Sequence, residues 1–145
     1  MERREPVVAG MFYEAAEQDC RRHVERCIAG HSPPDDLGDL LGGVVPHAGW
    51  SFSGPTAAKV FLALRKSAPE TFVLLGAVHR SFRQEPAAFP EGAWVTPLGE
   101  VAVDAEALAA VREAGIDVSA EEHADEHSIE VQIPFIQVLF PDARI

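Results

Sequence analysis

Apolar positions recur along the chain with two different periods, which together predict a mixed α/β fold. Apolar side chains that return every three or four positions predict three helices, over residues 14–29, 56–67 and 105–115. Ser53 and Pro55 supply a capping hydroxyl and a first-turn proline for the second helix, and Asp104 can cap the third. Gly30 and Gly115 stand where the first and third helices are expected to end.

Two unbroken apolar stretches, residues 42–46 and 71–79, predict buried strands. With the second helix they fit within about 35 residues, the size of a βαβ unit, so the strands are predicted to be parallel neighbours. A Pro-Leu-Gly turn within residues 93–104 predicts a β-hairpin. Residues 125–140 have helical spacing again, and the interior Pro134 predicts a kink.

The composition suits a globular protein and limits its partners. With 145 residues, 47% of them hydrophobic, we predict a single α/β domain over residues 1–145. The last helix leads into a further strand that stops at Ile145, so we expect this domain to be the N-terminal part of a longer one. A formal net charge of −11 argues against nucleic acid or an anionic membrane as a partner.

The two cysteines indicate a reducing compartment. Cys20 and Cys27 would lie on one face of the first helix but roughly 10 Å apart, too far for a disulfide. They are expected to be small core residues, and the charged N-terminus has no apolar signal core. We therefore predict a cytoplasmic protein.

Three histidines are candidates for a functional site. His47 ends the first apolar stretch and His79 ends the second, so parallel strands about 4.8 Å apart would place both imidazoles at one sheet edge. Two imidazoles there could share one metal ion. His127 and Glu130, spaced i, i+3 on a helix starting near Glu126, could supply a general base and its orienting carboxylate.

Simpler interpretations exist for each of these residues. A histidine after a strand is often a loop residue with a local hydrogen bond, and Glu126 and Glu130 could be solvated helix charges. A catalytic metal usually has three protein ligands, and only His47 and His79 are assigned here. The third ligand could come from the cluster at residues 123–130, and otherwise it is expected to lie outside this sequence.

Five motifs in order resemble the MEMO family, whose bacterial and archaeal members include AmmeMemoRadiSam system protein B. They are the stretches "REPVVAGMFY", "VVPHAGWSFSGPTAA", "LLGAVH", "TPLGEVAVD" and "DEHSIEVQIPFIQ". The resemblance implies a fold like that of class III extradiol dioxygenases, a LigB-like sandwich around a central, largely parallel sheet flanked by helices. It also implies an iron or copper ion held by His47 and His79, with a cysteine ligand from the family's second half. Glu126, His127 and Ser128 would line the same pocket.

These expectations lead to a mononuclear non-haem iron or copper protein with dioxygenase-like redox chemistry, in which His127 and Glu130 are catalytic. Two alternatives remain: a non-enzymatic adaptor that binds a peptide or a small anion, and a zinc-dependent hydrolase. An adaptor for phosphopeptides would need arginines near the pocket, for which Arg80 and Arg83 are the candidates. The expected ligand is a small molecule or a peptide, and a homo-oligomer would be compatible with each of these functions.

Overall fold

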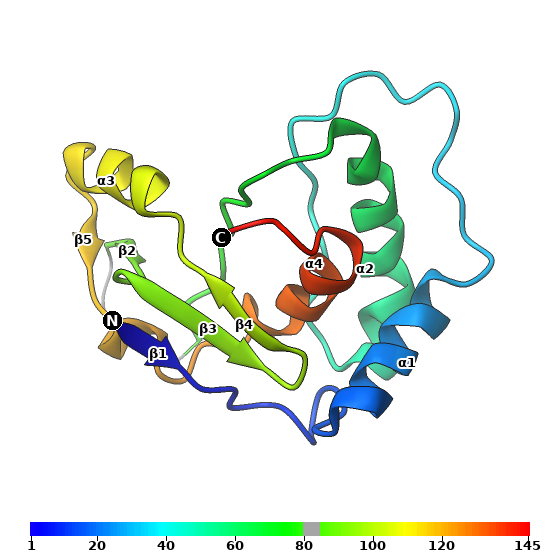
Figure 1. Ribbon diagram of the computed structural model, residues 1–145, viewed down its shortest axis with the longest axis horizontal. Helices are drawn as coiled ribbons and strands as arrows, with labels where there is room; N and C mark the ends of the chain where they lie inside the picture. Colours follow the sequence, from blue (N-terminus) through cyan, green and yellow to red (C-terminus); the bar gives the residue numbers. More distant parts are fainter. Residues whose placement is uncertain (80–84) are drawn as a thin grey trace.

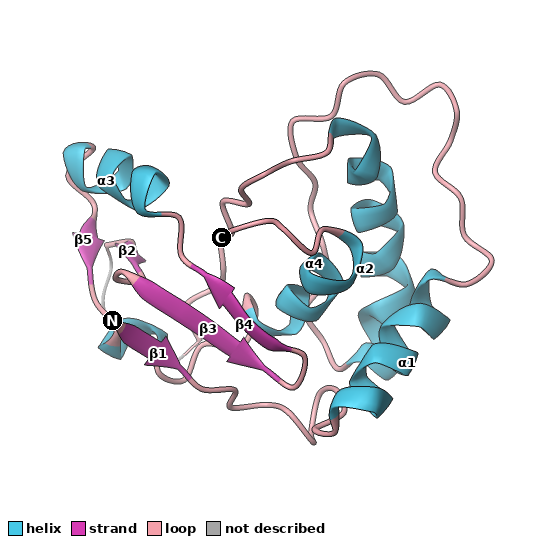
Figure 2. Ribbon diagram, viewed as in Figure 1, coloured by secondary structure: helices cyan, strands magenta, loops and turns pink. Residues whose placement is uncertain are grey.

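The computed structural model describes residues 1–79 and 85–145, in which three helices pack together beside a small sheet (Figures 1 and 2). Helices α1 (Glu17–Ile28), α2 (Trp50–Leu64) and α4 (Ile133–Leu139) contact one another. Helix α3 (Ala105–Glu113) lies apart from them, beyond the sheet (Figure 1). The predicted α/β class is confirmed, whereas the LigB-like sandwich stays a prediction.

The first and third helices follow the predicted pattern. Helix α1 buries its apolar stripe, and Gly30 follows it with a positive φ of 75°, as expected for a helix end. Asp104 caps α3 by accepting hydrogen bonds from the backbone N–H groups of Glu106 and Ala107. The hydroxyl of Thr71 also donates to this carboxylate, at 2.5 Å, and this bond is the main reason why the pKa of Asp104 is lowered.

Helix α2 begins earlier than its capping signals predict. It starts at Trp50 with Gly49 as its N-cap, and a short 3₁₀ turn, η1 (Arg65–Ser67), extends its end. Ser53 does not cap the helix because its hydroxyl donates to the carbonyl of Ala48, at 2.8 Å, from inside the first turn.

Two small sheets form, and the larger one includes the predicted hairpin. Strands β3 (Gly92–Thr96) and β4 (Gly99–Ala102) pair antiparallel, and β1 (Glu2–Arg4) adds to β3 in parallel, giving the order β1-β3-β4. Strands β2 (Ala87–Ala88) and β5 (Asp117–Val118) form a second, parallel pair. The sequence pattern did not predict β1, which is three residues long and charged throughout.

The two strands predicted at residues 42–46 and 71–79 are not strands in the described part of the chain. Apart from an isolated bridge between Thr71 and Arg144, neither stretch pairs with a neighbouring strand there. A strand is defined by its ladder, so an apolar pattern alone does not make one. Residues 42–46 pass closely over α2: a Cβ on Gly43 would lie 2.3 Å from the side chain of Val60.

The segment before α4 also differs from the expected continuous helix. It contains two 3₁₀ turns, η2 (Glu121–His123) and η3 (Glu130–Gln132), and the α-helix proper begins only at Ile133. Pro134 therefore stands in the first turn of α4, where its missing N–H costs nothing, and the predicted kink is wrong.

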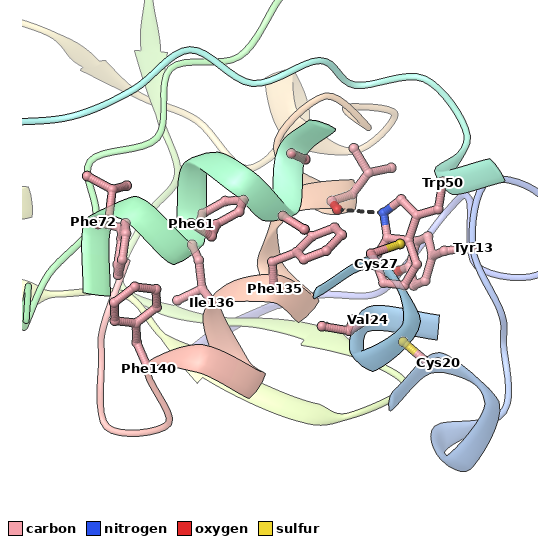
Figure 3. Close-up of a cluster of buried hydrophobic side chains, with 14 of the residues drawn as sticks. Tyr13, Cys20, Val24, Cys27, Trp50, Phe61, Phe72, Phe135, Ile136 and Phe140 are labelled. Carbon is pink, nitrogen blue, oxygen red and sulfur yellow. Dashed lines mark hydrogen bonds between the residues drawn. The ribbon is translucent and has the colours of Figure 1, made fainter. Parts of the chain in front are cut away.

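The main core is aromatic and lies among α1, α2 and α4 (Figure 3). The rings of Phe61 and Phe135 stack with their centres 5.6 Å apart, and the indole N–H of Trp50 donates to the carbonyl of Val131 at 2.9 Å. Cys20 and Cys27 are free and buried in this core, as predicted. Burial raises the pKa of the Cys20 thiol to about 12. None of the helices formed by the described residues is long and apolar enough to cross a membrane.

Candidate functional site

Three imidazole rings converge where the sequence places the candidate site. The ring centres of His47 and His79 lie 5.3 Å apart, and those of His79 and His127 lie 4.2 Å apart in a stacked arrangement. The centres of His47 and His127 are separated by 6.3 Å. The predicted meeting of His47 and His79 is thus confirmed even though no parallel strand pair brings them together.

Side chains from the segment before α4 hold both apolar stretches just ahead of their histidines. Gln132 donates through Nε2 to the carbonyl of Pro46 at 2.9 Å, one residue before His47. The backbone N–H of Ala77 donates to the hydroxyl of Ser128 at 2.8 Å, two residues before His79. The segment that carries His127 is therefore hydrogen-bonded both to the stretch before His47 and to the stretch before His79.

Gly76 allows this close approach. A Cβ at this position would lie 2.7 Å from Oγ of Ser128 and 2.8 Å from Cγ1 of Ile129, closer than real side chains come. Glycine is thus needed here for space.

The turn around His127 is fixed by its own neighbours. The carboxylate of Glu126 accepts hydrogen bonds from the hydroxyl and N–H of Ser128 and from the N–H of Ile129. The ring of Phe12 packs edge-on against that of His127, with centres 5.2 Å apart. The carbonyl of Phe12 in turn accepts from the N–H of Trp50, at 2.8 Å, which joins this loop to the start of α2.

Glu130 is fully buried and binds the N-terminal segment. Its carboxylate pairs with the guanidinium of Arg4 and accepts hydrogen bonds from Tyr13 Oη at 2.9 Å and from the N–H groups of Val7 and Val8 at 2.9 and 3.0 Å. Burial and this negative charge raise the pKa of Tyr13 well above its usual value.

This environment changes the expected relation between His127 and Glu130. The α-helix starts at Ile133, so the i, i+3 spacing of these two residues does not place them on one helical face. The contacts of Glu130 indicate a structural role, whereas the ring of His127 packs against those of His79 and Phe12. A catalytic role for either residue stays a prediction.

Within the described residues, the histidine cluster does not provide three ligands for one metal ion. Among residues 1–79 and 85–145, no group of three or more His, Cys, Asp and Glu side chains is arranged to bind one ion. Two imidazoles bound to one ion through nitrogens about 2.1 Å from it have ring centres about 5 Å apart. The 5.3 Å between His47 and His79 fits such a pair, and a further ligand would have to come from elsewhere.

A cavity of about 830 Å³ opens beside the cluster. Residues 72–79 form one wall and α3 another, and the residues around η2 add a rim with several carboxylates. His79 lines this cavity, whereas His47 and His127 do not. Its size is that of pockets for small organic ligands. Arg80 and Arg83, the predicted arginines for phosphate recognition, lie outside the described residues.

Together these features define a mixed α/β protein with a histidine cluster at the ends of two apolar segments. Residues 4–145 match the family model described as Memo-like protein, and the chain belongs to that family, which confirms the predicted resemblance.

Curated relatives agree. The MEMO1 family protein MK0963 of Methanopyrus kandleri is 43% identical over 150 residues, which cover 97% of this chain and 53% of the relative. MEMO1 family proteins of Pyrobaculum aerophilum and Thermococcus onnurineus are 39% and 42% identical, with 98% and 97% of this chain matched to 54% and 49% of theirs. The chain therefore spans about half the length of these relatives.

Sequence reasoning missed three residues that shape the site: Phe12, Gln132 and Arg4. The apolar turn around Phe12 gave no sign that it would contact His127, which lies far away in sequence. Gln132, only 4% exposed, is a polar residue in an otherwise apolar stretch, and that position was the one available signal. Arg4 lies in a charged N-terminus that is typical of an exposed tail, yet it is buried.

Proposed function

We propose that this protein binds one redox-active metal ion, iron or copper, through the imidazoles of His47 and His79. The observation that supports the proposal is the 5.3 Å separation of these two rings at the ends of two converging segments. A bound iron or copper ion would supply open coordination positions and redox chemistry of the dioxygenase type. The working compartment of such a protein is expected to be the cytoplasm.

The surrounding residues would orient the two ligands and move protons. Gln132 and Ser128 fix the backbone just before His47 and His79, so the imidazoles need little rearrangement to bind an ion. The ring of His127 stacks on that of His79 with the ring centres 4.2 Å apart. From there His127 could accept a proton from a molecule bound at the metal ion, or donate one to it. The ring of Phe12 packs edge-on against that of His127 and helps to hold it in place.

Metal loading of the purified protein tests this proposal. The protein is incubated with Cu²⁺, or with Fe²⁺ without oxygen, then desalted and analysed for bound metal. His47→Ala and His79→Ala should each lower the bound metal, and the double variant should lower it at least tenfold. His31→Ala is the matched control, because His31 follows α1 and takes no part in the cluster. Unchanged binding in the double variant would refute the proposal.

A second candidate function follows from the cavity. Its volume of about 830 Å³ and its apolar walls suit a non-enzymatic module that binds a small molecule or a peptide. Metal identity separates the candidates: iron or copper supports the redox site, zinc a hydrolase, and no metal the binding module.

A further inference from the structure

The carboxylate of Glu126 is occupied by donors of its own turn. It accepts hydrogen bonds from the hydroxyl and the backbone N–H of Ser128, and from the N–H of Ile129 at 2.9 Å. A carboxylate offers about four acceptor positions, and three donors use them here. The side chain is therefore held in one place, although it lines the same cavity as His79.

The hydroxyl of Ser128 passes this anchoring on to a second segment. A serine hydroxyl has one hydrogen to donate and lone pairs that accept. Because an ionised carboxylate can only accept, the hydrogen points to Glu126, and a lone pair accepts the N–H of Ala77 at 2.8 Å. Hydrogen bonds to an ionised acceptor are stronger than neutral ones, so Glu126 fixes the direction of the hydroxyl. Without this carboxylate the hydroxyl would be free to rotate away from Ala77.

The contact between the two segments is close and leaves the hydroxyl few alternatives. Ser128 is 6% exposed, and a buried hydroxyl has to satisfy its hydrogen bonds within the protein. The lack of a side chain at Gly76 gives Oγ the space to reach the N–H of Ala77. His79 follows only two residues later, so a shift of Ala77 moves the imidazole of His79.

Arg4 holds the backbone of the same turn from the other side. Its guanidinium donates to the carbonyl of Glu126 and, through Nε at 3.1 Å, to that of His123. The same guanidinium pairs with Glu130, and the side chains of both partners are buried. The position of Glu126 is thus set by a buried ion pair as well as by the turn itself.

We propose that Glu126 is a positioning residue of the metal site, which holds His79 in its ligand position through Ser128 and Ala77. The inference rests on the proposed metal function and names the carboxylate that acts on one of its ligands. The sequence pattern pointed to Glu130 for a role beside the site, whereas the hydrogen bonds lead from Glu126 to the segment of His79. Groups that orient metal ligands typically change metal affinity by about 10–100-fold when they are removed.

Competition for Cu²⁺ with a chelating dye measures this effect on the purified protein. Glu126→Met keeps the length of the side chain but removes both acceptors, and it should weaken Cu²⁺ binding by about 10–100-fold. Ser128→Ala should weaken it by a similar factor, and the double variant no further, because both changes break the same chain of hydrogen bonds. Glu126→Gln keeps one acceptor oxygen and should recover most of the affinity. Glu122→Gln, which alters another carboxylate at the same cavity, is the matched control and should bind like wild type.

Hydrogen exchange of the Ala77 amide in metal-free protein gives a second readout. It should be about tenfold faster in Glu126→Met and Ser128→Ala than in wild type or Glu126→Gln, under conditions where urea unfolding shows all of them to be folded. Wild-type Cu²⁺ affinity in Glu126→Met, losses that multiply in the double variant, or unchanged exchange of Ala77 would overturn the proposal. If wild type itself binds no Cu²⁺, the metal function is refuted instead, and the exchange of Ala77 alone decides whether Glu126 positions this segment.

Discussion

Replacing Glu130 by glutamine would show whether this carboxylate holds the fold together or serves the site. Its side chain is completely buried, and that of its partner Arg4 is 3% exposed. Tyr13, Val7 and Val8 donate three further hydrogen bonds to the same two oxygens. Glutamine keeps the volume but removes the charge, and its NH₂ group cannot accept any of these bonds.

The expected loss of stability is large. Removing one partner of a buried ion pair leaves the other charge uncompensated and costs about 3–5 kcal/mol. Tyr13→Phe removes one of the hydrogen bonds to the carboxylate and should cost about 1.5–3 kcal/mol. Domains are stable by about 5–15 kcal/mol, so Glu130→Gln should remain folded but unfold at a clearly lower urea concentration.

Urea unfolding followed by tryptophan fluorescence measures both effects. Trp50 and Trp94 are the two tryptophans, both are buried, and the guanidinium of Arg4 lies 4.6 Å from the ring centre of Trp94. Glu121→Gln, at an exposed position in η2, is the matched control and should change stability by less than about 0.5 kcal/mol.

The double variant Arg4→Met, Glu130→Gln should regain part of the loss, because no buried charge is then left unpaired. Unchanged stability of Glu130→Gln, together with loss of metal binding, would refute the structural role and favour the predicted catalytic one.

Three further measurements follow from the structure. Asp104→Asn should lower stability at pH 7, and the difference from wild type should shrink as the pH falls below about 4 and through the lowered pKa of Asp104. A stability difference that does not change with pH would contradict the lowered pKa. The thiol of Cys20, completely buried and with a raised pKa, should react with a disulfide reagent at pH 8 only when urea unfolds the protein, and rapid labelling in buffer would contradict its burial. Gly76→Ala should lower the free energy of unfolding in urea by about 1–3 kcal/mol, because the new Cβ would crowd Ser128. An unchanged midpoint would show that residues 72–79 and the segment around Ser128 separate easily.

Local patterns predicted the elements that depend on nearby residues. The stripe of Cys20, Val24 and Cys27 in α1 and the capping carboxylate of Asp104 in α3 act within a few residues, so the sequence is enough to locate them. The start of α2 was predicted wrongly because the hydroxyl of Ser53 bonds to a carbonyl instead of capping the helix, a choice that depends on the fold around it.

The site was predictable only in part for the same reason. His47 and His79 stand out because each ends an apolar run, and they do meet. Gln132 bonds to Pro46, the residue before His47, across 86 positions, and Phe12 packs against His127 across 115 positions; a single sequence gives no signal for either contact. The prediction of strands at residues 42–46 and 71–79 was wrong because a strand needs a neighbour to pair with. Residues 73–76 have no such neighbour within the described chain.

The ties between β1 and the rest of the protein have a consequence for folding during synthesis. Residues 2–4 pair with residues 92–94, and Arg4 pairs with Glu130, which is 126 positions further along the chain. At ribosomal rates of about 5–20 residues per second, Glu130 is added roughly 6–25 s after Arg4. The first strand has no partner until residues 92–94 are made, and Arg4 has no counter-charge until Glu130 is made, so α1 and α2 can associate while the sheet must wait.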